Sequence, residues 1–327
     1  MNVRRLIPTA ALASATVLGL TALTACSSSA ADDKDGKLDI VASFYPMQYL
    51  AEQIGGDHVS VTTLTEPGQE PHDLEISARQ RGELEESDVA LYLKGLQPAV
   101  DKAIDQSGIK TKVDATTLTS TKKHGNEVGG HAHEHDHAED EEGHEGHDHG
   151  HSHEGADPHV WLDPVKYAEV AEGVGKALEK ADPKHAKTYE KNTAALVKKL
   201  DGLNKSFEDG LKNTDSKVFI TTHAAFGYLA ERYGLTEEAI SGLDPEGEPS
   251  NKRILDLQKM AKADGVTTVF YETLVSDKTA QTLAKDTGLK TDVLDPIEGI
   301  TDDSKGDDYM QVMQSNLKAL QKALGAK

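Results

Sequence analysis

Short runs of strand-forming residues alternate with helical patterns along most of this 327-residue chain. In its first third, strands are predicted at residues 38–44, 59–64 and 88–93, and helices at 45–54 and 76–86. A strand, a helix and a further strand in succession form a parallel pair of strands with the helix packed on the sheet. The alternation therefore predicts an α/β protein built on parallel sheets.

The same alternation returns after residue 216. Three strands and four helices are predicted there, the strands at 218–221, 267–271 and 291–294 and the helices at 224–233, 251–263, 277–286 and 307–324. Since each lobe needs its own sheet, we expect a first lobe at residues 37–163 and a second lobe at residues 215–327.

The segment between the lobes, residues 164–214, has no strand pattern and carries Pro164 and Pro183 where helices would begin. One helix is predicted at 165–181 and a longer one at 183–211, where leucine and phenylalanine recur every three or four residues. At 1.5 Å per residue the longer helix would measure about 42 Å. Because a helix of this length is a rigid link, we expect no wide hinge closure between the lobes.

Composition excludes several classes of protein. With 35 Lys and Arg against 56 Asp and Glu, the formal charge is -21, which disfavours binding to nucleic acid. A single cysteine excludes a disulfide framework and a cysteine-based zinc or iron–sulfur site. A mean hydropathy of -0.54 excludes a protein with many membrane spans.

The N-terminus has the layout of a secretory signal peptide, predicted at residues 1–25. Its apolar run of about 16 residues is shorter than the roughly 20 that a spanning helix needs, which disfavours a membrane-spanning helix. The chain's one cysteine, Cys26, ends this run in Leu-Thr-Ala-Cys, which resembles a bacterial lipidation site. We therefore expect cleavage before Cys26, acylation of its thiol, a flexible tether at residues 26–36, and an extracytoplasmic protein anchored to the cell membrane.

Residues 124–154 contain ten histidines and ten acidic residues with almost no apolar side chain. Such a segment buries too little surface to offset its ordering entropy, so we predict a disordered insertion in the first lobe. Its imidazoles are expected to form an auxiliary zinc trap of weak, exchangeable ligands: His131, His133, His135, His137, His144, His147, His149, His151 and His153. The alternatives are a merely solubilising acidic tract or an engineered tag.

Four residues at or near predicted strand ends are candidate metal ligands. His72 lies in a turn-rich loop after the second strand, His159 between two Asp-Pro pairs, His223 at the end of strand 218–221, and Asp295 after the last strand. Each has an ordinary structural explanation by itself, such as a loop, a helix cap or an Asp-Pro turn. Together they place two ligands in each lobe at the carboxyl ends of parallel strands, where α/β proteins bind ligands.

The remaining histidines and the search for enzyme motifs say less about function. His58 and His185 flank a predicted strand and a predicted helix, and we expect both on the surface. A secreted zinc hydrolase is disfavoured because the chain has neither an HExxH motif nor a GxSxG motif. We therefore expect no enzyme.

In several motifs the chain resembles the solute-binding lipoproteins of zinc and manganese ABC importers, in which a rigid helix links two lobes. The resemblance runs from about residue 38 to the C-terminus and is carried by PHDLE at 71–75, ALYLKGL at 90–96, DPHVWLDP at 157–164 and THAAFGY at 222–228. It implies capture of Zn²⁺ by His72, His159, His223 and Asp295, and delivery to a membrane permease with its cytoplasmic ATPase. The oligomeric state is open, with a monomer as the default for a binding protein.

Two questions stay open at this stage. The fourth ligand is Asp295, Glu298, Glu70 or water, because the family varies at this position. The function is zinc import, with manganese import by the same fold or zinc buffering without a transporter as alternatives. A histidine at position 223, where manganese members commonly carry a carboxylate, favours zinc.

Overall fold

The first lobe is built on a four-stranded sheet whose strands all pair in parallel, in the order β2-β1-β3-β4. The computed structural model describes residues 36–125, 127–128 and 156–327. The elements of the first lobe are β1 (Leu38–Ala42), α1 (Tyr45–Gly55), β2 (Val59–Thr63), α2 (Ala78–Glu86), β3 (Val89–Tyr92), α3 (Pro98–Gln106) and β4 (Thr111–Asp114).

The second lobe is built on a five-stranded sheet in the order β5-β7-β6-β8-β9. Four of its strands pair in parallel, and only the edge strand β5 (Glu127–Val128) is antiparallel to its neighbour. The other elements are β6 (Val218–Thr221), α6 (Gly227–Tyr233), β7 (Thr236–Ala239), α7 (Asn251–Ala263), β8 (Thr268–Tyr271), α8 (Lys278–Thr287), β9 (Lys290–Val293) and α9 (Tyr309–Leu324).

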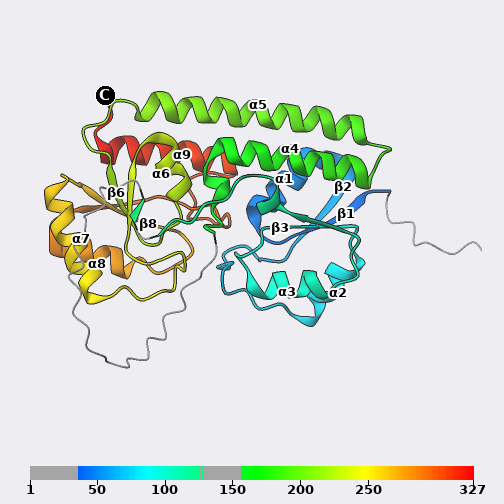
Figure 1. Cartoon of the computed structure of the whole chain (residues 1–327), viewed down its shortest axis with the longest axis horizontal. Coiled ribbons are helices and arrows are strands. Elements are labelled where there is room, and N and C mark those ends of the chain that lie inside the picture. Colours follow the sequence, from blue (N-terminus) through cyan, green and yellow to red (C-terminus); the bar gives the residue numbers. More distant parts are fainter. Residues whose placement is uncertain (1–35, 126, 129–155) are drawn as a thin grey trace, which may run out of the picture. The chain divides into compact units, whose positions relative to one another are not determined.

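The predicted α/β fold with two parallel sheets and a long linking helix is confirmed. Two helices connect the sheets, α4 (Pro164–Ala181) and α5 (Ala186–Leu211), and the 26 residues of α5 span about 39 Å. Asp163 caps α4 by accepting a hydrogen bond from the backbone N–H of Val165. In Figure 1, α4 and α5 run along one side of both sheets, while α2, α3, α7 and α8 cover the opposite side.

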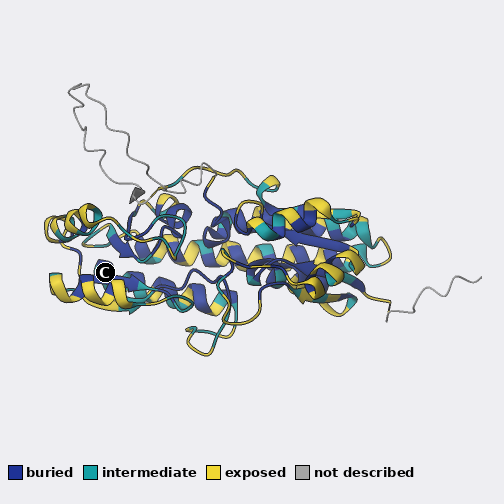
Figure 2. Ribbon diagram, turned by 90° about the horizontal axis from the view of Figure 1, so that it is seen from below, coloured by how far each residue is buried: buried dark blue, intermediate teal, exposed yellow. Residues whose placement is uncertain are grey.

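One hydrophobic core runs through both lobes and the linking helices. It includes Phe44 beside β1, Trp161 between the lobes, Phe207 on α5 and Tyr309 on α9, none of which is more than 2 % exposed. Two smaller clusters fill the opposite faces of the two sheets, under α2 and α3 and under α7 and α8. Figure 2 shows this buried interior continuing along the molecule. Because close-packed cores resist deformation, the shared core supports a stiff connection between the lobes.

The histidine-rich insertion begins later than the sequence predicts. Residues Glu127 and Val128 add an edge strand to the second sheet by pairing with Glu238 and Glu237 of β7, and His124 also belongs to the folded body. Backbone hydrogen bonds to an open sheet edge explain why this short polar stretch is ordered. The nine histidines of the predicted trap, and Cys26 with the predicted signal and tether, lie outside the described residues.

No helix within the described ranges combines the length and the apolar composition needed to cross a membrane.

Candidate metal centre

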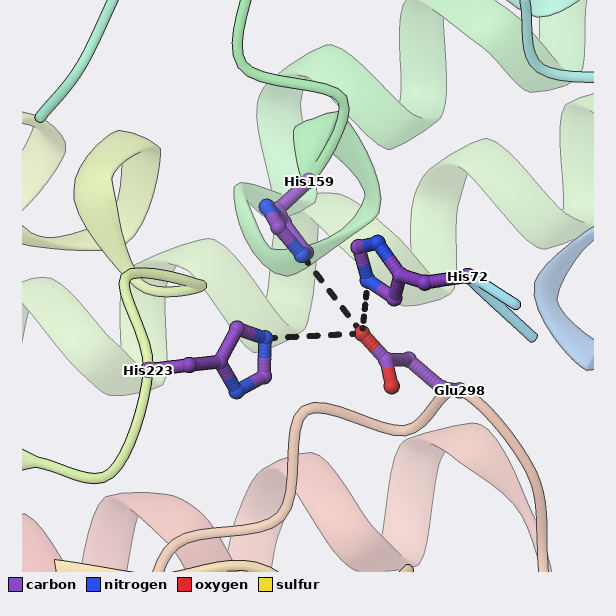
Figure 3. A group of neighbouring side chains, drawn as sticks. All are labelled: His72, His159, His223 and Glu298. Carbon is purple, nitrogen blue, oxygen red and sulfur yellow. Dashed lines mark hydrogen bonds and ion pairs between the residues drawn. The ribbon is translucent and has the colours of Figure 1, made fainter. Parts of the chain in front are cut away.

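Four side chains from distant parts of the chain point toward one another: His72, His159, His223 and Glu298 (Figure 3). His72 lies in the loop that follows β2, His159 directly precedes a short helical turn, His223 follows β6, and Glu298 follows β9. Their candidate ligand atoms all lie within 4.8 Å of one another. The three predicted histidines are therefore brought together. His72 and His223 follow parallel strands, as the strand-end rule predicts, whereas His159 precedes a helical turn.

The distances between Glu298 and the three histidines fit tetrahedral coordination of one ion. Oε1 of Glu298 lies 3.2 Å from Nε2 of His72, 3.5 Å from Nε2 of His159 and 3.6 Å from Nε2 of His223. Zinc–nitrogen and zinc–oxygen bonds of about 2.0–2.2 Å in a tetrahedron separate the ligand atoms by roughly 3.3–3.6 Å. Glu298 therefore already stands, relative to each of the three histidines, close to the spacing that one zinc-sized ion would impose.

The centre is buried and its ligand atoms lack other partners. The side chains of His159, His223 and Glu298 are at most 2 % exposed, while that of His72 is 12 % exposed. Within the described residues, Nε2 of His159, Nε2 of His223 and Oε2 of Glu298 have no hydrogen-bond partner. Buried polar atoms are normally paired, so unpaired ring nitrogens on two neighbouring buried histidines indicate a site for a ligand.

Each of the two buried histidines is held by a carboxylate on its other ring nitrogen. Nδ1 of His159 lies 2.7 Å from Oδ1 of Asp157, and Nδ1 of His223 lies 2.8 Å from Oε1 of Glu272. A neutral imidazole that donates from Nδ1 leaves the lone pair of Nε2 free for a metal. The arrangement matches the carboxylate–histidine pairs that commonly support zinc ligands.

Proton affinities within the centre reflect its charges. Burial alone raises the pKa of Glu298, but the neighbouring His72, His159 and His223 outweigh it and hold that pKa well below its usual range. Burial alone lowers the pKa values of His159 and His223, but their carboxylate neighbours raise both above the ordinary histidine value. A divalent cation would therefore have to displace protons from these imidazoles.

A strained turn presents Glu298 to the other ligands. Ile297 adopts a φ of 59°, a left-handed conformation that is costly for a β-branched residue and persists where its surroundings fix it. The turn is fixed from both sides: Asp295 accepts a hydrogen bond from the N–H of Ile297, and the indole of Trp161 donates to the carbonyl of Pro296 at 2.7 Å.

Asp295, the residue that the sequence favours as fourth ligand, lies outside the group. Its Oδ1 accepts the N–H of Ile297 at 2.8 Å and its Oδ2 faces the hydroxyl of Thr273, so its carboxylate shapes the turn. Burial raises its pKa to about 6. Glu70 is also outside the group, because its two oxygens accept the N–H groups of His72 and Asp73.

His58 and His185 belong to another part of the molecule. Their rings stack 3.9 Å apart, and Nδ1 of His185 lies 2.6 Å from Oδ2 of Asp182. His58 precedes β2, so the pair stands at the amino end of that strand, opposite the end from which His72 follows.

A cavity of about 420 Å³ adjoins the centre. It is lined by His72 and Asp157, by Lys94 from the first lobe and by Asp244 from the second. His72 is the most exposed of the four grouped residues. His72 is therefore the member of the group that borders the cavity.

Comparison with known proteins agrees with this geometry. Residues 40–323 match the family described as zinc-uptake complex component A periplasmic (ZnuA). The zinc-binding lipoprotein AdcA of Streptococcus pneumoniae is 38% identical over 304 residues, which are 91% of this chain and 58% of AdcA. The high-affinity zinc uptake system protein ZnuA of Bacillus subtilis is 35% identical over 300 residues, 90% of each chain.

Solved structures show the same fold. The crystal structure of Zn(II)-bound AdcA from Streptococcus pneumoniae superposes with a TM-score of 0.71 at 34% identity, covering 88% of this chain and 58% of that one. The metal-dependent lipoprotein YcdH of Bacillus subtilis superposes with a TM-score of 0.69 at 32% identity, covering 88% of this chain and 99% of that one. The chain thus spans a little over half the length of AdcA and nearly all of the shorter relatives. It belongs to the family of zinc-uptake complex component A proteins.

Proposed function

We propose that this protein captures Zn²⁺ outside the cytoplasm and delivers it to the permease of an ABC importer. The observation that carries the proposal is the buried group of His72, His159, His223 and Glu298, in which the glutamate oxygen stands at tetrahedral spacing from all three histidines. The printed names of the relatives, which are zinc-binding lipoproteins and zinc uptake proteins, support the same cargo.

The donor set favours zinc over manganese. Three imidazole nitrogens and one carboxylate oxygen suit Zn²⁺, whereas Mn²⁺ prefers oxygen-rich sites of higher coordination number. The three neutral histidines and Glu298 would leave a site with one net positive charge around Zn²⁺. Asp157 and Glu272, which hold His159 and His223, place further negative charge close by and favour the cation.

The proposed location follows from the N-terminal sequence. Residues 1–25 would direct export, Cys26 would carry the lipid that anchors the protein to the membrane, and residues 26–36 would form the tether. A monomer in this position can pass its cargo to a permease that works with a cytoplasmic ATPase. Because α5 and the shared core stiffen the link between the lobes, release would use movements of the ligand loops.

The histidine-rich segment would add a second, weaker mode of zinc binding. Its pattern of alternate histidines at His131, His133, His135 and His137 offers many exchangeable ligand pairs among acidic residues. Such a trap would raise the local concentration of zinc near the buried centre. The alternative function, a zinc-buffering lipoprotein without a transporter, would use this segment as its main site.

Zinc calorimetry on the protein without residues 1–26 tests these assignments. Three forms are compared: the parent, His72→Ala, and a variant in which residues 129–155 are replaced by a short Gly-Ser linker. We expect one tight site that His72→Ala loses and the linker variant keeps, with additional weak sites that only the linker variant loses.

Two results would change the proposal. Tight binding that disappears with residues 129–155 and survives His72→Ala would favour the buffering lipoprotein. Tighter binding of Mn²⁺ than of Zn²⁺ in a competition at equal concentrations would favour manganese import.

A further inference from the structure

His124, the first histidine of the predicted insertion at residues 124–154, is packed into the folded body. Its side chain is 8 % exposed and lies between two carboxylates, with Nδ1 2.7 Å from Oδ2 of Asp157 and Nε2 3.4 Å from Oε2 of Glu231. The ring of Tyr228 meets it edge to face, with the ring centroids 4.6 Å apart. An imidazole in this setting is not available as a freely exchanging metal ligand.

The absence of a side chain at Gly227 leaves room for the imidazole of His124. A methyl group added to Gly227, the first residue of α6, would stand 2.6 Å from Nδ1 of His124, so any larger residue would push the ring away. The hydroxyl of Tyr228 accepts the N–H of Lys122 and donates to the carbonyl of Asp157 at 2.9 Å. The segments that carry His124 and Asp157 are therefore fixed to α6 and to each other.

Asp157 uses both of its oxygens to join His124 to the metal centre. Oδ2 faces His124, while Oδ1 accepts both the backbone N–H of His159 at 2.9 Å and its Nδ1–H at 2.7 Å. The Asp157 side chain has no exposed surface. A fully buried carboxylate needs a partner that compensates its charge. His124 contacts one oxygen of Asp157, and His159 contacts the other.

We propose that His124 is a positioning residue for the metal centre: through Asp157, it fixes the orientation of the His159 imidazole and so strengthens metal binding. This inference rests on the proposed function, since it concerns the affinity of the same site. It assigns His124 to the support of the buried centre and separates it from the nine histidines of the predicted trap.

The charges around His124 support this role. Both of its ring nitrogens face carboxylate oxygens, so the ring is best satisfied when both nitrogens carry hydrogen and donate. Burial alone lowers the pKa of His124, but the hydrogen bonds to Asp157 and Glu231 outweigh it and raise that pKa. His124 at Oδ2 and His159 at Oδ1 contact the Asp157 carboxylate from two sides, so this geometry fixes the carboxylate that holds His159.

Three single variants of the protein without residues 1–26 test the inference by Zn²⁺ titration against a chelator. His124→Leu removes the donor to Asp157, and we expect about tenfold weaker binding, the lower end of the 10–100-fold range for loss of a direct partner of a metal ligand, because His124 acts through Asp157. His124→Asn places an amide N–H near the position of Nδ1 and should recover much of that loss. His185→Leu is the matched control: it removes a similar histidine–aspartate pair at the opposite end of the first sheet, and should bind Zn²⁺ like the parent.

Gly227→Ala gives an independent test, because it displaces the His124 ring without removing it. We expect Gly227→Ala to weaken Zn²⁺ binding in the parent and to cause little further loss in the His124→Leu background, so that the two changes are not additive. The visible absorption of bound Co²⁺ reports the ligand geometry directly. It should change in His124→Leu and in Gly227→Ala, and stay unchanged in His185→Leu.

The outcomes separate this inference from the function on which it rests. A parent that binds Zn²⁺ tightly, with His124→Leu equal to it in affinity and in Co²⁺ spectrum, overturns the role of His124 alone. If His124→Leu does not fold, parent-like affinity in Gly227→Ala overturns it instead. A parent without a tight site contradicts the proposed function, and the positioning role with it.

Discussion

Oε1 of Glu298 lies 3.2 Å from Nε2 of His72, although 226 positions separate the two residues in the sequence. One residue follows the second strand of the first sheet and the other follows the last strand of the second sheet. Their contact closes the metal centre across the two lobes. A cation bound there would draw its ligands from both lobes and so join them.

Replacement of Glu298 tests which carboxylate completes the centre. Glu298→Gln keeps the shape of the side chain but removes its charge, so Zn²⁺ affinity should fall by more than the roughly 100-fold upper limit for loss of an outer partner. Asp295→Asn is the matched control, since its carboxylate accepts a turn hydrogen bond that an amide oxygen can also accept, and it should change affinity less than tenfold. A larger loss in Asp295→Asn than in Glu298→Gln would restore Asp295 as the ligand.

The pH dependence of zinc binding follows from the raised pKa values of His159 and His223. A histidine with a raised pKa holds its proton until the pH exceeds the ordinary value of about 6.5, and zinc must displace that proton. Affinity should therefore begin to fall while the pH is still above 6.5, and fall further below it. Calorimetry in buffers of different ionisation enthalpy should show proton release at pH 7, and its absence there would contradict the prediction.

The three histidines of the centre could be predicted because the short stretch of sequence around each one marks it. Each stands in or beside a loop at which a parallel α/β sheet assembles its ligands, and the segment around His159 carries the chain's only tryptophan. The fourth member could not be predicted with the same rule. Asp295 comes first after the strand, but it forms a turn with Ile297, and the left-handed backbone at Ile297 brings Glu298 to the site.

Composition conceals two other features. The sequence predicts no strand at β7, whose residues are Thr-Glu-Glu-Ala, and nothing in that pattern indicates that Glu237 and Glu238 are both buried by the fold around them. Residue type alone groups His124 with the histidine-rich segment. Its spacing is the signal that sets it apart, since six residues separate it from the next histidine, whereas the following four histidines alternate.

The ion pair between Arg232 and Asp163 ties α6 to the start of α4. The guanidinium contacts both oxygens of Asp163, with an Nη2–Oδ2 distance of 2.7 Å, and the carboxylate side chain is 2 % exposed. Arg232→Ala leaves the buried Asp163 carboxylate with only the hydrogen bond from the N–H of Val165. The free energy of unfolding should therefore fall by about 2 kcal/mol. The loss stays below the roughly 3–5 kcal/mol of a fully buried pair because the guanidinium is about one-third exposed.

Urea unfolding of the metal-free protein measures this loss. Arg232→Lys, which keeps the charge but not the two-point contact, should lose less than Arg232→Ala. The control is Arg79→Ala, whose arginine pairs with Glu83 on the surface and should change stability by at most about 0.5 kcal/mol. Equal effects at positions 79 and 232 would show that the buried pair contributes little.

Because of Glu237, the free energy of unfolding of the metal-free protein should fall as the pH rises. Its Oε1 accepts hydrogen bonds from the hydroxyl of Thr221 and the N–H of Phe226, while Oε2 has no partner among the described residues. Burial raises its pKa from 4.5 to about 7, against the lowering effect of those hydrogen bonds. Between pH 4.5 and about 7, native Glu237 holds a proton that the unfolded state has lost. The contribution of Glu237 to stability is therefore greatest below pH 4.5 and declines until about pH 7.

Glu237→Gln removes this titration while keeping the acceptor for Thr221 and Phe226. The free energy of unfolding of Glu237→Gln minus that of the parent should therefore grow between pH 5 and pH 8, by at most about 3 kcal/mol for a shift of this size. The slope is the test, because any constant cost of the new amide N–H group appears equally at every pH. Glu238→Gln, at the neighbouring residue paired with Arg253, should instead lose stability through its broken ion pair. A difference for Glu237→Gln that stays flat or shrinks with rising pH would show that Glu237 is already ionised in the native protein.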